Sequence, residues 1–176
     1  MRLTEGHIHV AARRLLRREG FILLAGQYPG GSDDELCALN VVDPTVACDD
    51  SPDPRRHSDG KLVPDLVALR GNVLLVVEMK PDYSEDDYRK LLVIRDQRRS
   101  DFNAALTRLS ASRSVPVPSP TTLRFVPVLG FHAKAKHVPD PQFGYLLVES
   151  LDVATLLLPD AVRSLLTMPH RDEESV

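Results

Sequence analysis

The chain has 176 residues, of which 43% are hydrophobic and 27% are charged, an ordinary balance for one globular domain with its own core. No apolar run approaches the roughly 20 residues of a membrane-spanning helix, and the first residues lack the apolar stretch of a secretory signal, so we expect a cytoplasmic protein without a membrane anchor. The formal net charge of −3 argues against a protein that coats nucleic acid non-specifically.

The N-terminal third predicts a helix, a strand and a long surface excursion. Residues 4–19 repeat apolar side chains at helical spacing, and Thr4 is a suitable cap at the start. Residues 21–25 are typical of a short buried strand. Residues 27–60 lose this periodicity and are rich in glycine, proline and aspartate, so we expect a long surface excursion with at most a short strand at 39–42.

The strongest local signal is a hairpin. Residues 62–69 and 73–79 are rich in valine and leucine, and the intervening Arg70-Gly71-Asn72 is typical of a tight turn centred on the last two of these residues. Such a turn places Arg70 opposite Val73. Counting back along both strands then places Asp65 opposite Glu78.

The chain after the hairpin predicts a long helix and two strands. Ser84 can cap a helix that we expect to continue to Leu109. Residues 123–129 and 143–148 are strand-like, and Pro127 indicates an edge or bulge position in the first of them.

The last segment predicts a helix and completes the fold class. Residues 151–168 have helical spacing with an interruption at Pro159, and the polar residues 169–176 are expected to form a flexible tail. The order of elements predicts a single α/β domain over residues 1–168, with a mixed sheet flanked by helices.

The hairpin register brings three charged side chains to one side of the sheet at its open end. Directly opposed residues point to the same side with their Cβ atoms about 5 Å apart, which applies to Asp65 and Glu78. Lys80 lies two residues beyond Glu78 and points the same way. Two carboxylates this close repel unless a cation lies between them, and with the Met79 carbonyl and waters they suit Mg²⁺. Lys80 could activate the attacking water or stabilise charge on a phosphate.

Pro64-Asp65, followed by Glu78-Met79-Lys80 at the end of the next strand, resembles the signature of the PD-(D/E)XK, or restriction-endonuclease-like, nuclease superfamily. The αβββαβ core of that family is similar to the order predicted for residues 4–129. The resemblance implies Mg²⁺-dependent hydrolysis of phosphodiester bonds by an endonuclease or nicking subunit, with Mn²⁺ as a substitute and with DNA a more common substrate than RNA. It implies Asp65 and Glu78 as metal ligands and Lys80 as the catalytic lysine.

The resemblance also implies roles for residues on the two helices. Many members aim a glutamate of the first helix at the metal, and Glu5 fits because it shares the apolar face of its helix with Ile8. The alternative for Glu5 is a first-turn acid favoured by the helix dipole. The second helix often lends a basic or polar residue, for which Lys90 is the candidate. His7 and His9 are two residues apart, so they lie on different helix faces and are not expected to form a metal pair.

Other interpretations remain open. The three charges could form a solvated rim with Lys80 bridging both acids, or the fold could be a catalytically inactive module that binds nucleic acid or a protein partner. The net acidity favours this second alternative, unless a homodimer or a partner subunit supplies the missing positive surface. Basic side chains elsewhere could line a nucleic-acid groove or be ordinary solvated residues: Arg13, Arg14, Arg17, Arg18, Arg89, Arg95, Arg98, Arg99, His132, Lys134, Lys136 and His137.

Overall fold

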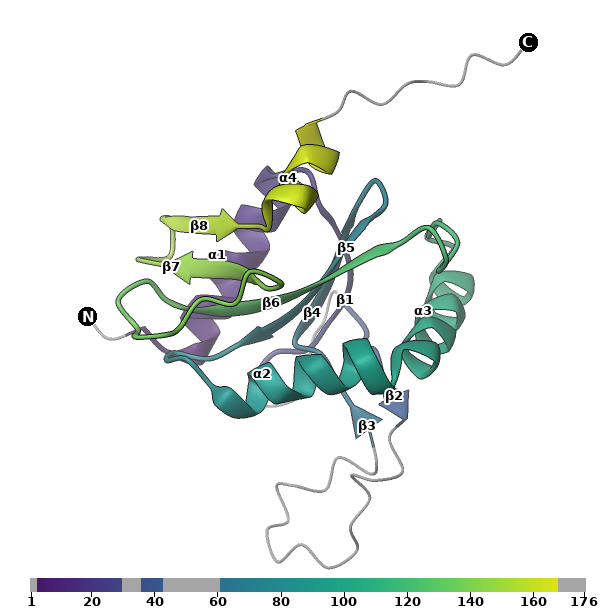
Figure 1. Cartoon of the computed structure of the whole chain (residues 1–176), viewed down its shortest axis with the longest axis horizontal. Coiled ribbons are helices and arrows are strands. Elements are labelled where there is room, and N and C mark those ends of the chain that lie inside the picture. Colours follow the sequence, from purple (N-terminus) through teal and green to yellow (C-terminus); the bar gives the residue numbers. More distant parts are fainter. Residues whose placement is uncertain (1–2, 30–35, 43–60, 168–176) are drawn as a thin grey trace, which may run out of the picture.

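The computed structural model describes residues 3–29, 36–42 and 61–167 and shows an α/β fold with a six-stranded mixed sheet between helices (Figure 1). Most of the predicted 27–60 excursion and the predicted tail at 169–176 lie outside the described residues. Among the helices that are described, none has the length and apolar character needed to span a bilayer.

The sheet is open and its strands are not in sequence order. The strand order is β1-β4-β5-β6-β7-β8, with β5–β6 and β6–β7 parallel and the other neighbours antiparallel, while β2 and β3 pair separately. The described elements are α1 (Glu5–Arg18), β1 (Ile22–Gly26), β2 (Val41–Val42), β3 (Lys61–Leu62), β4 (Leu66–Arg70), β5 (Val73–Met79), α2 (Glu85–Leu92), the π-helical segment η2 (Val93–Gln97), α3 (Arg99–Arg113), β6 (Arg124–His132), β7 (Gly144–Val148), β8 (Ala154–Leu157) and α4 (Asp160–Thr167).

Helices cover both faces of the sheet. Val73, Leu75 and Val77 of β5 belong to the core that α1 and α4 complete, whereas Leu74 and Val76 belong to the core shared with α2, η2 and α3. Figure 1 shows the same division, with α1 and α4 on one side of the strands and α2 and α3 on the other. Because β5 is buried on both faces, its residues from Val73 to Val77 form a continuous apolar run and do not alternate with polar residues.

The predicted hairpin register is confirmed. Arg70 pairs with Val73, and the pairing continues without a shift to Leu66 and Val77. Gly71 has a φ of 58°, which glycine adopts at little cost and which the first central residue of a tight hairpin turn requires.

The prediction for residues 151–168 is wrong in its first half. Ala154–Leu157 form β8, which pairs antiparallel with β7, and the helix α4 is confined to Asp160–Thr167. The leucine spacing that suggested a helix also suits a strand in which half-buried and exposed residues alternate. The edge of β7 offers a backbone pairing partner, and this tertiary contact outweighs the local preference.

The prediction of one uninterrupted helix from Ser84 to Leu109 is also wrong. The α-helix ends at Leu92, five residues then form η2, and Arg98, with a φ of −118°, separates η2 from α3. The Arg98 N–H donates to the Val93 carbonyl five residues earlier, the bond that defines a π-helical turn. Figure 1 shows that the chain changes direction between α2 and α3.

Candidate functional site

Asp65 lies directly before β4 and binds the end of β5 through its side chain. Its Oδ2 accepts the Met79 N–H at 2.7 Å. In an antiparallel ladder the N–H and C=O of one residue point to the same neighbouring strand, so the Met79 carbonyl faces this side too. Extending the register by two residues places Pro64 opposite Met79, and proline has no N–H to donate. The Pro-Asp pair therefore satisfies the Met79 N–H through the Asp65 side chain and offers no main-chain N–H from Pro64 to the Met79 carbonyl.

Glu78 is held between a carboxylate and an ammonium group. Its side chain is 2% exposed, and its Oε1 lies 2.8 Å from Lys90 Nζ of α2. The same ammonium donates to the Val63 carbonyl at 2.6 Å. Burial raises the pKa of Glu78 to about 8; the Lys90 charge opposes this rise and the Asp65 charge adds to it. Lys90, the candidate basic residue of the second helix, therefore lies directly against Glu78.

Lys80 and Glu5 form an ion pair between the end of β5 and the start of α1. Lys80 Nζ lies 2.8 Å from Glu5 Oε1, although the two residues are 75 positions apart in sequence. Partial burial acts against the Lys80 charge, but the hydrogen bond and charge of Glu5 outweigh it, and the Lys80 pKa is raised. Lys80 therefore carries its proton at neutral pH, which suits a group that stabilises negative charge better than one that removes a proton.

His9 belongs to the same cluster, and the sequence analysis missed it. The side chain is fully buried on α1, and its Nε2 lies 3.8 Å from Asp65 Oδ2. Glu5, His9 and Asp65 each offer a ligand atom, and these atoms all lie within 4.8 Å of one another. His7 instead accepts the Thr4 N–H through Nδ1 at 3.1 Å as part of the helix cap, so His7 and His9 have separate roles. The spacing of Glu5 and His9, one helical turn apart, was the available signal.

The donor set of this cluster suits a divalent cation. Burial also raises the pKa of Asp65, because Lys90, the Met79 N–H and Lys80 offset the cost of burial only in part. The nearby lysines therefore compensate the burial of Asp65 and Glu78 only in part, and a cation between these two carboxylates would add to that compensation. Carboxylate and carbonyl oxygens suit Mg²⁺ and Mn²⁺, and the imidazole of His9 extends the set toward transition metals.

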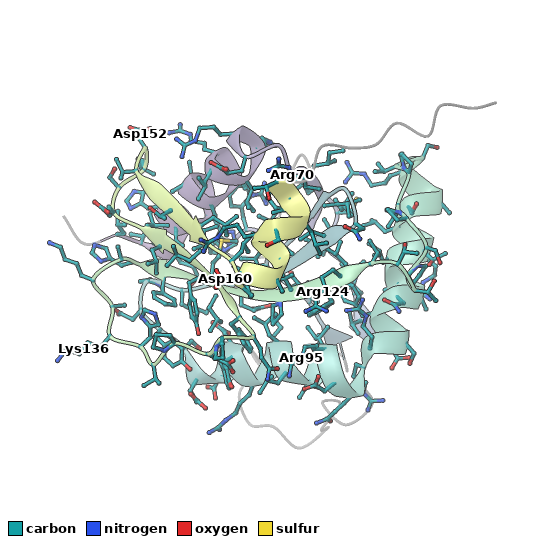
Figure 2. The ribbon with its side chains drawn as sticks, turned by 45° about the horizontal axis from the view of Figure 1, so that its top comes forward. Arg70, Arg95, Arg124, Lys136, Asp152 and Asp160 are labelled. Carbon is teal, nitrogen blue, oxygen red and sulfur yellow. The ribbon has the colours of Figure 1, made fainter. Side chains whose placement is uncertain are left out.

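Three of the remaining basic candidates lie in different surroundings, away from a shared basic surface. Arg13 is 3% exposed and its guanidinium lies 4.0 Å from the centre of the Tyr28 ring, so it is not part of a basic face of α1. His137 packs against Phe131 with a ring-centre distance of 4.8 Å. Lys136 is exposed and points away from the molecule in Figure 2.

The N-terminal cap of α1 positions Glu5 and His9, and its removal should destabilise the protein measurably. Thr4 Oγ1 accepts the His7 N–H at 3.3 Å, the interaction that a Thr4→Ala variant loses. We expect its free energy of unfolding to fall by about 1 kcal/mol in urea denaturation. A Thr4→Ser variant, which retains the hydroxyl, should remain close to wild type. Equal losses in both variants would show that the cap hydrogen bond is not the cause.

No family model matches this chain, and neither a curated protein nor a solved structure matches it. The function is therefore inferred from the geometry of the site and from the resemblance of its motif.

Proposed function

We propose that this chain is a divalent-metal-dependent nuclease of the PD-(D/E)XK type that hydrolyses phosphodiester bonds, with DNA favoured over RNA. The observation that carries the proposal is the meeting of Asp65, Glu78 and Lys80 with Glu5 at one end of the sheet. The order α1, β1, β4, β5, α2 and β6 follows the αβββαβ arrangement and supports the same proposal.

Each side chain has a role in this proposal. Asp65 with Glu5 or His9 would hold the cation, and Glu78 and the Met79 carbonyl would complete its ligands. A bound Mg²⁺ or Mn²⁺ would supply Lewis-acid stabilisation of the charge that develops on the phosphate. The Lys80 ammonium, which Glu5 orients, stabilises the same charge from the protein side.

A second candidate is a catalytically inactive module of this fold that binds nucleic acid or a protein partner. The specific observation in its favour is that two lysines already neutralise the acids: Lys90 lies beside Glu78, and Lys80 lies beside Glu5, each at 2.8 Å. A cation has to compete with these ammonium groups. A homodimer or a partner subunit could shift this balance and supply positive surface that a chain with a net charge of −3 lacks.

The deciding experiment is a nicking assay on supercoiled plasmid with Mg²⁺ or Mn²⁺, an EDTA control and a Lys80→Ala variant. We expect the wild type to convert supercoiled to open-circular DNA only with a divalent cation. The variant should be slower by a factor of about 100 or more, because it loses the charge that stabilises the transition state.

The outcomes separate the candidates. Activity that persists in EDTA or in the Lys80→Ala variant would exclude the assigned site. A wild type that binds Mn²⁺ or DNA without cleaving DNA or RNA would favour the binding module.

A further inference from the structure

A basic cavity lies at the other end of the sheet, where β6 begins. It is a cavity of about 590 Å³, within the size range of small-ligand sites. Its charged lining consists of Arg95, Arg99, Arg124 and Asp96, which leaves an excess of positive charge. In the sheet register Arg124 pairs with Val73 at the turn end of β5, whereas the nuclease-like cluster surrounds Met79, six residues and about 20 Å further along.

The arginines of this cavity differ in how far their charge is neutralised. Arg95 binds both carboxylate oxygens of Asp96, at 2.6 and 2.8 Å, and also Gln142 at 2.9 Å. Arg99 is half-buried with its guanidinium 4.4 Å from the centre of the Phe125 ring, and no carboxylate among the described residues lies within ion-pair distance. The Arg99 guanidinium donates to a neutral acceptor, the Leu123 carbonyl, at 3.4 Å, and burial lowers the Arg99 pKa.

The backbone of β6 adds a donor to the same cavity. β7 pairs with β6 only from Val128 onward, so the residues from Arg124 to Pro127 have a strand on one side alone within the described residues. The Arg124 N–H donates to the Asn72 carbonyl beside β5, and strand alternation therefore points the Phe125 N–H to the open edge. Pro127 has no N–H, which makes further strand pairing along this edge unfavourable and leaves it free for a ligand.

We propose that this cavity binds the phosphate group of a nucleotide-sized ligand, with Arg99 and Arg124 as its cations and the Phe125 N–H as a main-chain donor. One guanidinium group can donate two parallel hydrogen bonds to two oxygens of the same phosphate. The cavity volume suits one nucleotide. Arg124 is exposed, and Figure 2 shows it on the same side of the molecule as Arg95, so the phosphate has access from solvent. The group could come from a free nucleotide or from a nucleic-acid strand. This site does not rest on the proposed nuclease function.

The test is isothermal titration of the full chain with inorganic phosphate, AMP and the oligonucleotide (dT)12 in EDTA and low salt, which excludes the metal-dependent site. The variants are Arg99→Gln and Arg124→Gln, and the matched control is Arg108→Gln, an exposed arginine elsewhere on α3. We expect saturable binding of at least one phosphate ligand that weakens about tenfold or more in each cavity variant, because a charge-assisted hydrogen bond is lost. Raising the salt concentration should weaken it further.

The probes identify the source of the phosphate. Binding of AMP indicates a free nucleotide, whereas binding of (dT)12 alone indicates a nucleic-acid strand. Three outcomes would overturn the proposal: no binding of any probe at millimolar concentration, unchanged binding in both cavity variants, or an equal loss in Arg108→Gln. Because Arg124 is exposed, Arg124→Gln should fold normally, and it remains informative if Arg99→Gln disturbs the packing on Phe125.

Discussion

An Asp65→Asn variant should cleave DNA about 1,000 times more slowly than the wild type in the presence of the metal, because it loses a charged ligand. The variant should retain its fold, because the substitution does not change the packing of the side chain. The asparagine is isosteric, and its amide oxygen can still accept the Met79 N–H that Asp65 accepts at 2.7 Å. The initial rate of plasmid nicking measures activity. Mn²⁺ titration by calorimetry measures the cation site directly, and we expect its affinity to fall with the rate.

The matched control is Asp152→Asn. Asp152 is exposed, pairs with Arg14 at 2.9 Å and lies at the rim of the molecule in Figure 2. Its loss should leave both the rate and Mn²⁺ binding unchanged. If Asp65→Asn keeps wild-type Mn²⁺ affinity, Asp65 is not a ligand and the proposed cation site is wrong.

A Lys90→Met variant should lose about 3 kcal/mol of stability at pH 9, since it leaves the buried Glu78 carboxylate without its partner. Burial raises the Glu78 pKa from 4.5 to about 8. At a pH between these two values, Glu78 is protonated in the folded state and ionised in the unfolded state. Wild-type stability from this group therefore falls as pH rises from about 5 to 8. Without Lys90 the Glu78 pKa rises further, and the variant should continue to lose stability above pH 8. Urea denaturation at pH 6 and pH 9 measures the widening difference.

Arg89→Met is the control for Lys90→Met. Arg89 is the preceding residue of α2, and its exposed pair with Glu85, at 3.4 Å, should contribute less than about 1 kcal/mol. Adding Glu78→Gln to Lys90→Met should restore most of the stability at pH 9, because it removes the charge that lacks a partner. A loss that is independent of pH, or that Glu78→Gln does not restore, would assign the effect of Lys90 to packing.

The sequence predicted the part of the site that depends on local geometry. The tight turn at Gly71 sets the pairing of Arg70 with Val73, and strand alternation then places Asp65, Glu78 and Lys80 without knowledge of the rest of the fold. Glu5 was a candidate from the helix face and the family pattern, and its ion pair with Lys80 places it at this end of the sheet. Predicting the positions of these residues required only the periodicity of individual strands and helices.

The errors concern features that tertiary packing decides. β8 forms at Ala154–Leu157 because β7 offers it an edge, and the π-helical turn before Arg98 depends on how the second helix packs against the sheet. His9 was judged only as a partner for His7, although the residue it approaches is Asp65, which lies far away in sequence. The resemblance named Lys90 as a candidate, but its contact with Glu78 required the relative placement of α2 and β5.

The turn at Gly71 determines the relative positions of Asp65 and Glu78, although it lies at the opposite end of the hairpin. Strands buried on both faces tolerate a one-residue slip better than amphipathic strands, since either parity presents apolar side chains to a core. The positive φ of Gly71 removes that ambiguity. A slip by one position would turn Asp65 to the opposite face from Glu78 and separate the two carboxylates while the core stayed apolar. The turn at one end of the sheet thus fixes which residues of the two strands face each other at the opposite end.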